Sequence, residues 1–245
     1  MTNIVLPDAG QRSLAFYLAM EEFVARNFEG EAFFVWQSEP TVIFGRNQVL
    51  ENEVNMEYCS RNGIEVVRRK SGGGCVYSDK GNIMISFISR RGDVAAVFDR
   101  YLSALTACLC SLGTEACRSG RNDILVGGRK VSGNAFHQLP DRSIVHGTLL
   151  HSTDLTSMEQ ALMPPVEKLQ RHGVESVRQR VMNLSEVLPL GLDDVKDALV
   201  EHFCEDSVVL EDTDLAAIEI LQKDYFVLPP LMSEKSVRPV DKLYY

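Results

Sequence analysis

The chain has 245 residues, of which 45% are hydrophobic and 24% are charged, and its formal net charge is −9. These values are typical of a globular protein with a full core, and no apolar run approaches the roughly 20 residues needed to span a bilayer. We therefore expect no membrane as partner. The acidic balance argues against a general DNA-binding protein, because that class carries a basic domain, so we also expect no nucleic acid as partner.

The six cysteines form no C-x-x-C pair, and the five histidines are scattered along the chain. We therefore expect reduced thiols and no structural metal. The N-terminus has neither a basic segment nor a following apolar one, so no export signal is indicated and we expect a cytoplasmic location. Charge is uneven, since residues 61–150 hold 13 Lys and Arg against 7 Asp and Glu. This positive middle region favours an anionic ligand or an acidic partner.

The first predicted element is a helix over residues 13–26. Its apolar residues recur at helical spacing, with Glu21 and Glu22 opposite them, so we expect an amphipathic helix that covers one face of a sheet. Residues 32–36 and 41–45 then predict two strands that pair with each other across a short turn.

A glycine-rich stretch follows a short helix predicted over residues 52–61. Residues 64–67 and 82–88 predict two strands of one sheet, and the loop between them carries Arg68-Arg69-Lys70-Ser71-Gly72-Gly73-Gly74-Cys75-Val76-Tyr77. Glycines let the backbone adopt positive φ angles and bring its N–H groups close to an anion. The loop fits neither of the two commonest nucleotide-binding patterns, and a flexible hairpin with solvated cations is the alternative.

The clearest helix covers residues 93–112, where one apolar stripe runs the full length and stops before Gly113. Further helices are predicted over residues 193–203 and 212–223, followed by an extended tail from residue 226. Short strands with hairpin-length links and a few helices predict an α+β sheet and not a doubly wound parallel one.

A second chemical stretch surrounds the pair Gly127-Gly128, which lies between two strand-like runs. This is a hairpin signal, so Asp123 and Lys130 lie on neighbouring strands where they can face each other. An exposed ion pair of small energy is the alternative. The small residues that follow Lys130, from Ser132 to Ala135, favour a ligand near the backbone.

A third stretch, Ser143-Ile144-Val145-His146-Gly147-Thr148-Leu149-Leu150, predicts a strand with a histidine at its centre. His146 is either a structural residue or a pocket residue, and its sequence position alone does not decide between the two.

Together these stretches resemble the lipoate–protein ligase A family. The resemblance covers residues 10–190 and rests on ordered motifs at family spacing, which are Pro40-Thr41-Val42 with Gly45-Arg46-Asn47-Gln48, Arg68-Arg69-x-Ser71-Gly72-Gly73-Gly74-x-Val76-Tyr77-x-Asp79-x-Gly81-Asn82, Gly120-Arg121-Asn122-Asp123-Ile124, Arg129-Lys130-Val131-Ser132-Gly133-Asn134-Ala135, His146-Gly147-Thr148-Leu149-Leu150, and Ser176-Val177-Arg178 with Arg180-Val181 and Asn183-Leu184.

The resemblance implies the biotin/lipoate ligase fold, a mixed, largely antiparallel sheet with flanking helices that is related to the core of class II aminoacyl-tRNA synthetases. It also implies the reaction, in which lipoate and ATP with Mg²⁺ form lipoyl-AMP, and the lipoyl group then passes to a lysine. The implied acceptors are lipoyl domains of 2-oxo-acid dehydrogenases and the glycine-cleavage H protein. Cations are needed there to neutralise charge that develops on the phosphates.

By the same resemblance Lys130 is the main catalytic cation, and Asp123 orients Lys130 or holds a magnesium ion. The residues expected to bind ATP or lipoyl-AMP are Arg69, Ser71, Gly72, Gly73, Gly74, Cys75, Val76, Tyr77, Asn82, Lys130, Gly133 and Ala135. The expected lipoate pocket consists of Arg46, His146, Gly147 and Thr148, with an apolar slot to which Trp36, Val42 and Phe44 contribute.

The chain departs from the pattern at its C-terminal end. We expect a catalytic domain over residues 1–205 and a C-terminal helix with an extended tail over residues 206–245, without the full accessory domain of family members that perform both half-reactions. Activation then needs a separate accessory protein, or the chain transfers a lipoyl or octanoyl group that is already activated. Two competing hypotheses are a transferase that uses Cys117 as its nucleophile and a binding module without activity.

Overall fold

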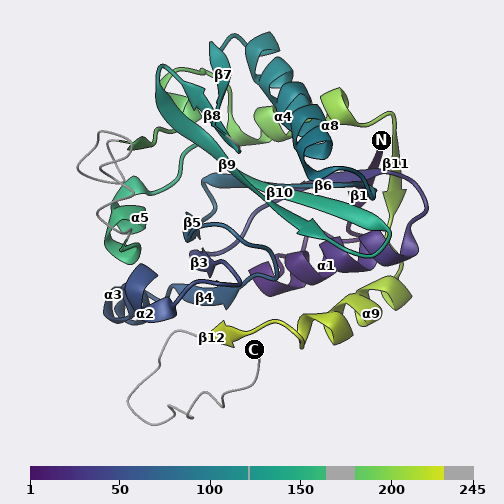
Figure 1. The fold of residues 1–245 in the computed structure, drawn as a ribbon, viewed down its shortest axis with the longest axis horizontal. Coiled ribbons are helices and arrows are strands. Elements are labelled where there is room, and N and C mark those ends of the chain that lie inside the picture. The colour runs from purple at the N-terminus through teal and green to yellow at the C-terminus, as the bar shows by residue number, and fades with distance from the viewer. Residues whose placement is uncertain (121, 164–179, 229–245) are drawn as a thin grey trace.

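The computed structural model describes residues 1–120, 122–163 and 180–228. Arg121, the motif residues Ser176, Val177 and Arg178, and the predicted tail beyond residue 228 lie outside this part of the chain. The described strands form two sheets, and helices lie around them (Figure 1).

The larger sheet has the strand order β11-β1-β2-β6-β10-β9-β8-β7. Its strands are β1 (Thr2–Val5), β2 (Ala32–Trp36), β6 (Asn82–Arg90), β7 (Ala116–Ser119), β8 (Asp123–Val126), β9 (Arg129–Gln138), β10 (Arg142–Leu150) and β11 (Asp206–Val209). The pairs β11/β1 and β1/β2 are parallel and the other neighbours are antiparallel. This confirms the predicted α+β class with a largely antiparallel mixed sheet.

A smaller sheet has the order β12-β4-β3-β5 and consists of β3 (Thr41–Phe44), β4 (Glu65–Arg68), β5 (Val76–Ser78) and β12 (Val227–Leu228). The predicted pairing of residues 32–36 with 41–45 is therefore wrong, because β2 pairs with β1 and β6, whereas β3 lies between β4 and β5. All four residues of β3 are buried, as expected for a strand that is paired along both edges and covered on both faces.

The glycine-rich loop connects β4 to β5 within the smaller sheet, and the strand at residues 82–88 belongs to the larger one. The loop does join two strands of one sheet, as predicted. The second of these strands is β5, however, and not the predicted strand over residues 82–88. Three-residue β5 is too short to give an alternating pattern in sequence.

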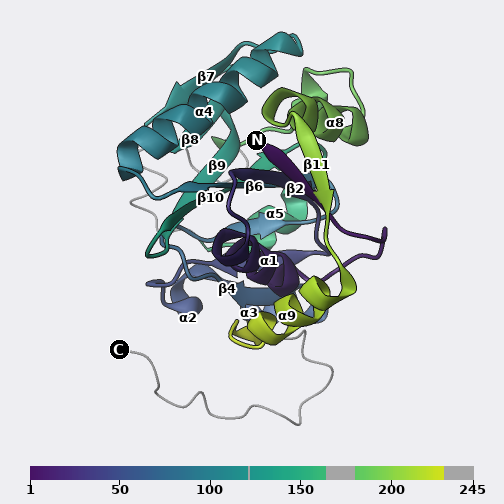
Figure 2. The ribbon, with the colours of Figure 1, turned by 90° about the vertical axis from the view of Figure 1, so that its right-hand side faces the viewer.

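Two layers of helices cover the larger sheet (Figure 2). Helices α4 (Val94–Ser111) and α8 (Leu192–Phe203) lie on one face, while α1 (Leu14–Asn27) and α9 (Asp212–Gln222) lie on the other. Helices α2 (Leu50–Glu53), α3 (Met56–Arg61) and α5 (Leu155–Ala161) pack beside the smaller sheet, and a 3₁₀ turn covers Leu184–Glu186. The helix predicted over residues 52–61 is thus two short helices, because Val54 bridges to Leu162 and Asn55 caps the second one.

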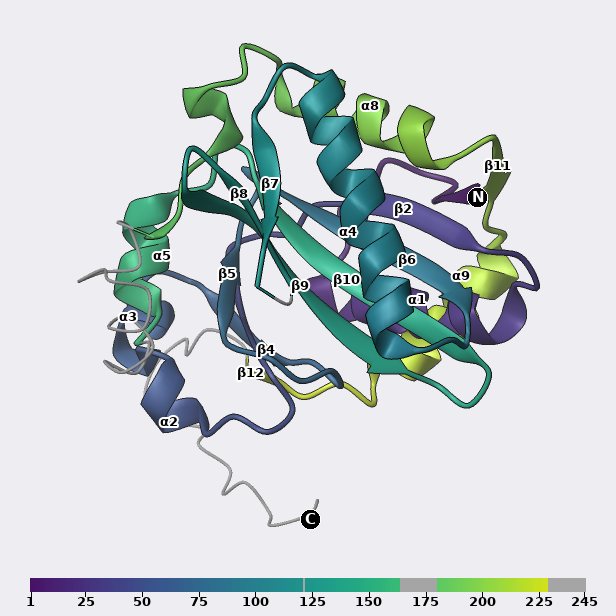
Figure 3. The same cartoon turned by 45° about the horizontal axis from the view of Figure 1, so that its top comes forward.

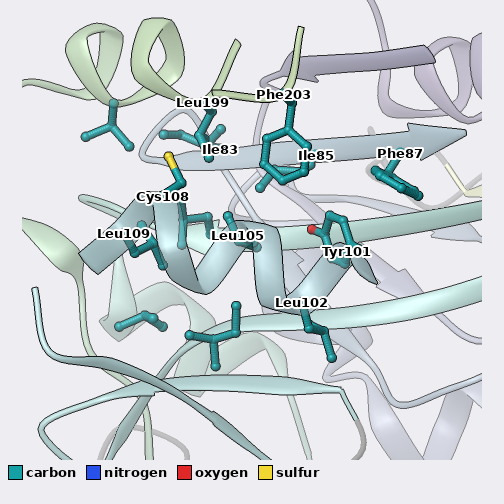
Figure 4. Packing of buried hydrophobic residues seen from close by; sticks show 14 of the residues in the cluster. Ile83, Ile85, Phe87, Tyr101, Leu102, Leu105, Cys108, Leu109, Leu199 and Phe203 are labelled. Carbon is teal, nitrogen blue, oxygen red and sulfur yellow. The ribbon is translucent and has the colours of Figure 1, made fainter. Parts of the chain in front are cut away.

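Helix α4 crosses the larger sheet (Figure 3) and forms the centre of its main core. Asp93 caps its N-terminus by accepting from the N–H of Ala96 at 3.0 Å. Figure 4 shows its apolar stripe, which includes Tyr101 and Leu105, against Ile83 and Ile85 of β6. By length and composition α4 is also apolar enough to cross a membrane, with a mean hydropathy of 1.3 over 18 residues. Its buried stripe in this cluster identifies it as a core helix.

Helix α1 differs from the amphipathic prediction. Ser13 caps it as a helix N-terminus requires, but Glu21 and Glu22 are each only 3% exposed. The prediction placed both carboxylates at the surface, and this is wrong because Glu21 faces strands β6 and β10 of the larger sheet, while Glu22 lies against Lys70 and Tyr225. Both carboxylates are instead paired within the protein, Glu21 with His146 at 2.9 Å and Glu22 with Lys70 at 2.6 Å.

Candidate functional site

A cavity of about 560 Å³ lies between the glycine-rich loop, the strands β6, β8, β9 and β10, and helices α1 and α4. Pockets of this size hold small-molecule ligands in many proteins. The residues that line it are Leu18, Ile43, Arg69, Gly72, Gly73, Gly74, Cys75, Val76, Met84, Phe98, Ser119, Gly120, Asn122, Asp123, Lys130, Gly133, Asn134, Ala135, Phe136, His146, Gly147, Thr148 and Arg180. The triple-glycine turn and Lys130 thus meet at one cavity.

The glycine-rich loop is curled around the guanidinium of Arg69, which is 5% exposed. This group donates to the carbonyl oxygens of Gly72 at 2.8 Å, Gly74 at 2.7 Å and Ile43 at 3.1 Å, and to the hydroxyl of Ser71 at 3.0 Å. Burial lowers the pKa of Arg69 to about 10, so the group keeps its charge at neutral pH. Arg69 therefore fixes the loop and places a buried positive charge beneath it.

Two glycines are required for this loop geometry. Gly73 has a φ of 97°, a value that side chains strongly disfavour. Gly45, at the end of β3, lies so close that a Cβ built on it is 2.3 Å from the carbonyl oxygen of Gly73. The glycine at position 45 is thus explained by contact with the loop, and the residues after it form a turn in which the N–H of Gln48 donates to the carbonyl of Gly45 at 3.0 Å.

The second half of the site is an ion-pair network on β8 and β9. The ammonium of Lys130 lies 2.7 Å from Oδ1 of Asp123, and the guanidinium of Arg180 lies 2.7 Å from Oδ2 of the same carboxylate. The three side chains are between 15% and 20% exposed. Two cations and one anion leave a net positive charge at this wall of the cavity.

The backbone explains how Lys130 reaches Asp123. Gly127 and Gly128 have φ angles of 55° and 77°, as a tight two-residue hairpin turn requires. The register places Asp123 opposite Gly133 and Lys130 opposite Leu125. Lys130 then extends across Gly133, where an added Cβ would lie 2.5 Å from its Nζ. The predicted facing of Asp123 and Lys130 is confirmed.

An exchange of hydrogen bonds between two asparagines holds the loop before β8. The side-chain amide of Asn134 donates to the carbonyl of Asn122 at 2.9 Å, and that of Asn122 donates to the carbonyl of Asn134 at 2.5 Å. The hydroxyl of Tyr101 donates to Oδ1 of Asn134 at 2.9 Å, which ties the pair to the core helix. A Cβ on Gly147 would lie 2.0 Å from that same oxygen, so glycine is needed there.

A buried chain of hydrogen bonds connects the loop to α1 through His146. Nδ1 of His146 lies 2.9 Å from Glu21, and Nε2 lies 2.6 Å from the hydroxyl of Ser71. Glu21 also accepts from Ser86 at 2.6 Å, and Ser86 accepts from the indole of Trp36 at 2.9 Å. In the neutral imidazole, Nδ1 donates to the carboxylate, and Nε2 accepts from the Ser71 hydroxyl. His146 thus lines the cavity and is also hydrogen-bonded through both ring nitrogens, to Glu21 and to Ser71.

The remaining predicted site residues do not line the cavity. Ser71 lies behind it, bonded to Arg69 and His146. Tyr77 points into the core cluster beside the smaller sheet, and Asn82 is fully buried with its amide directed at the carbonyl of Tyr77. Arg46 is exposed and touches the loop through its backbone N–H, which donates to the carbonyl of Ser71 at 2.9 Å.

The predicted apolar slot is wrong in its residues. Val42 and Phe44 are buried in the cluster beside the smaller sheet, and Trp36 stacks on Tyr17. Alternation along β3 turns Ile43 toward the cavity and its two neighbours away. The apolar wall consists of Leu18, Ile43, Val76, Met84, Phe98 and Phe136.

Sequence reasoning missed several residues of the site. Arg180 belongs to a recognised motif, but nothing in that motif predicts that its guanidinium pairs with Asp123. Glu21 is predicted at the surface and is buried instead. A polar residue inside the helical pattern of residues 13–26 gives no sign of its partners, because His146 is 125 positions away in the sequence.

Cys117 is exposed on β7, two residues before Ser119, and does not line the cavity formed by the described residues. Within the same part of the chain, no cluster of three or more His, Cys, Asp or Glu is arranged to hold a metal ion. Cys75, in contrast, does line the cavity.

Comparisons with known proteins agree on one family. The family model described as the lipoyl protein ligase A/B catalytic domain matches residues 13–204. Lipoate–protein ligase 1 of Staphylococcus aureus is 38% identical over 218 residues, which are 85% of this chain and 66% of that protein. The chain therefore spans slightly less than two thirds of the length of this relative.

Solved structures show the same fold. A bipartite lipoate protein ligase from Thermoplasma acidophilum, described with its E2 lipoyl domain, superposes with a TM-score of 0.78 at 26% identity and covers 91% of each chain. A lipoate-protein ligase A bound with ATP superposes with a TM-score of 0.80 at 24% identity, over 91% of this chain and 94% of that one. The biotin/lipoate ligase fold expected from the sequence is confirmed.

Proposed function

Because the chain belongs to the lipoyl protein ligase A/B catalytic domain family, we propose that it is a lipoate–protein ligase. In this proposal the cavity binds lipoate and ATP, forms lipoyl-AMP with release of pyrophosphate, and presents the lipoyl group to a lysine of an acceptor protein. One observation supports it most directly: the glycine-rich loop, Lys130 and an apolar wall all line the same cavity.

The charges suit the first half-reaction. A lipoate carboxylate that attacks the α-phosphorus of ATP approaches a group that is already negative, and charge on the phosphates grows as pyrophosphate departs. Lys130 and the buried charge of Arg69, which both line the cavity, counter this repulsion. Lys130 acts as a fixed cation, because the nucleophile of the second half-reaction is the lysine of the acceptor.

The apolar wall suits the substrate. An acyl chain gains free energy when it leaves water for aliphatic and aromatic surface, at about 25 cal/mol per Å². Met84, Phe98 and Phe136 supply such surface beside the polar end formed by His146 and Thr148. The dithiolane end of lipoate fits the apolar part, and its carboxylate fits the part near Lys130.

Magnesium enters this proposal only as the partner of ATP. Proteins usually hold Mg²⁺ through one or two carboxylates together with substrate phosphates. Asp123 is the carboxylate that lines the cavity among the described residues, and each of its oxygens is paired with a cation. This arrangement does not fit a protein-held ion at Asp123, because Lys130 and Arg180 already engage both oxygens.

A second candidate function is suggested by the bipartite lipoate protein ligase from T. acidophilum, whose fold this chain shares with a TM-score of 0.78. In that alternative the same cavity transfers a lipoyl or octanoyl group that is supplied as an adenylate, or activates lipoate only together with an accessory protein. The bipartite ligase from T. acidophilum supports the second form. The absence of Cys117 from the described residues that line the cavity disfavours a thioester route.

We further infer that the acceptors are lipoyl domains of 2-oxo-acid dehydrogenases and the glycine-cleavage H protein. The archaeal ligase, described with its E2 lipoyl domain, supports the first of these. We also infer a cytoplasmic location, and the six free cysteines support a reducing compartment.

Exchange of labelled pyrophosphate into ATP tests the proposal. The chain is assayed with lipoate, octanoate or biotin, and with or without a lipoyl domain, and transfer from synthetic lipoyl-AMP is measured in parallel. Lipoate-dependent exchange together with transfer establishes the ligase. Transfer without exchange establishes the alternative, and absence of both refutes the assignment.

A further inference from the structure

Lys130 and Arg180 share one carboxylate. Each lies 2.7 Å from a different oxygen of Asp123, so both cationic groups are held beside the same carboxylate at one wall of the cavity. A nucleotide presents anionic oxygens on adjacent phosphates, and two cations held at one carboxylate can each bind one of them.

The backbone holds this pair rigidly. Val181 forms a parallel bridge with Lys130, and the N–H of Met182 donates to the carbonyl of Lys130 at 3.0 Å. Arg180 therefore emerges one residue before a fixed contact with β9, although it is 50 positions from Lys130 in the sequence. A side chain anchored in this way loses little conformational freedom when it binds a ligand, which favours a binding role.

Burial distinguishes this network from ordinary surface pairs. The side chains of Arg180 and Asp123 are 19% and 15% exposed, and both line the cavity. By contrast, neighbouring Arg129 pairs with Glu186 at 2.8 Å with about 40% of each side chain exposed, and it lies outside the cavity lining. A second cation on an already paired carboxylate adds an excess positive charge that faces the ligand space.

We propose that Arg180 is a second catalytic cation, which binds the phosphates that leave as pyrophosphate while Lys130 binds the α-phosphate. This inference rests on the proposed function. In the step concerned, a lipoate carboxylate oxygen forms a bond to the α-phosphorus, the bond to the oxygen that bridges to the β-phosphate breaks, and its electron pair departs with pyrophosphate. Arg180 compensates the charge that this oxygen acquires. Asp123 holds both cations in place before ATP arrives.

These two roles predict different effects of Arg180 and Lys130 on the two half-reactions. Pyrophosphate is absent once lipoyl-AMP has formed, so Arg180 contributes to ATP binding and adenylate formation but not to acyl transfer. Lys130 contacts the α-phosphate, which is present in both ATP and lipoyl-AMP, and contributes to both half-reactions. A purely structural ion pair would affect both alike.

Isothermal titration calorimetry on the full chain tests this difference without requiring turnover. The probes are ATP with Mg²⁺ and a non-hydrolysable lipoyl-sulfamoyl-adenosine, which lacks the leaving phosphates. Arg180→Gln is expected to weaken ATP binding by about ten- to hundredfold, as for loss of a charge-assisted hydrogen bond, and analogue binding by less than about threefold. Arg180→Lys keeps the charge and is expected to fall between the wild type and Arg180→Gln.

Two further variants provide the controls. Lys130→Gln is expected to weaken both probes, and Arg129→Gln, which removes a neighbouring arginine outside the cavity, is expected to weaken neither. Equal weakening of both probes by Arg180→Gln, or none, overturns the inference, and if that variant does not fold, Arg180→Lys decides by the same comparison. Failure of the wild-type chain to bind the analogue would instead refute the proposed function.

Discussion

Gly45→Ala is the substitution that tests most sharply how the glycine-rich loop is built. A Cβ at this position lies 2.3 Å from the carbonyl oxygen of Gly73, whereas ordinary contact begins at 3.4 Å. The opposing atom belongs to the backbone, so no side-chain rotation relieves the overlap. The loop or the end of β3 must therefore move by about 1.1 Å, the difference between those two distances.

A displacement of this size matters more to catalysis than to folding. Misplacing reacting groups by about 1 Å costs on the order of a hundredfold in rate, whereas overpacking costs about 1–3 kcal/mol of stability. We expect Gly45→Ala to lower kcat/KM for ATP by about a hundredfold in the pyrophosphate exchange assay. Circular dichroism should show a folded chain with a moderately lower Tm.

Gly92→Ala is the matched control, because the nearest atom to its Cβ is a methyl group of Val97 at 3.1 Å, which a small side-chain movement relieves. It lies outside the cavity lining and should leave both the rate and Tm nearly unchanged. Near-normal activity of Gly45→Ala would show that the loop is not held against β3 as described.

Three further outcomes are expected. Cys117→Ala should leave acyl transfer within about twofold of the wild type, and loss of transfer with an intact fold would favour the thiol route. Cys75 lines the cavity, so an alkylating reagent should inactivate the enzyme more slowly in the presence of ATP and Mg²⁺, and equal inactivation rates would place ATP elsewhere. Burial alone would raise the pKa of Glu22, but the hydrogen bond and charge of Lys70, 2.6 Å away, outweigh it and hold the pKa below its ordinary value. This contact stabilises the fold above that ordinary pKa and is lost as the pH falls through the lowered value, so Lys70→Met should cost about 1 kcal/mol at pH 7 and progressively less below about pH 4. Urea unfolding at both pH values measures this, and a cost that does not change with pH would contradict it.

Local patterns in the sequence are sufficient to predict elements whose signals are complete within a short stretch. The apolar stripe of α4 and the Gly127-Gly128 turn each specify their own structure, and the turn fixes which strands carry Asp123 and Lys130. Motifs tied to backbone geometry, such as the triple glycine, are located correctly for the same reason.

Features that depend on distant partners are not predictable in this way. A glutamate within a helical pattern, such as Glu21, is ordinarily predicted at the surface. It is buried here because it bonds to Ser86 on β6 and His146 on β10, which are far away in the sequence. The pairing of β3 likewise depends on β5, whose three residues carry no pattern of their own. Arg180 joins the site because Val181 bridges to Lys130, a contact between segments far apart in sequence.

A structure of the chain crystallised with the non-hydrolysable lipoyl-adenylate analogue tests the central claim most directly. We expect the group that replaces the phosphate to lie between the Gly72–Gly74 turn and the ammonium of Lys130, with the acyl chain against Met84 and Phe136. Binding of the analogue elsewhere, or with its phosphate position out of reach of Lys130, would contradict the account.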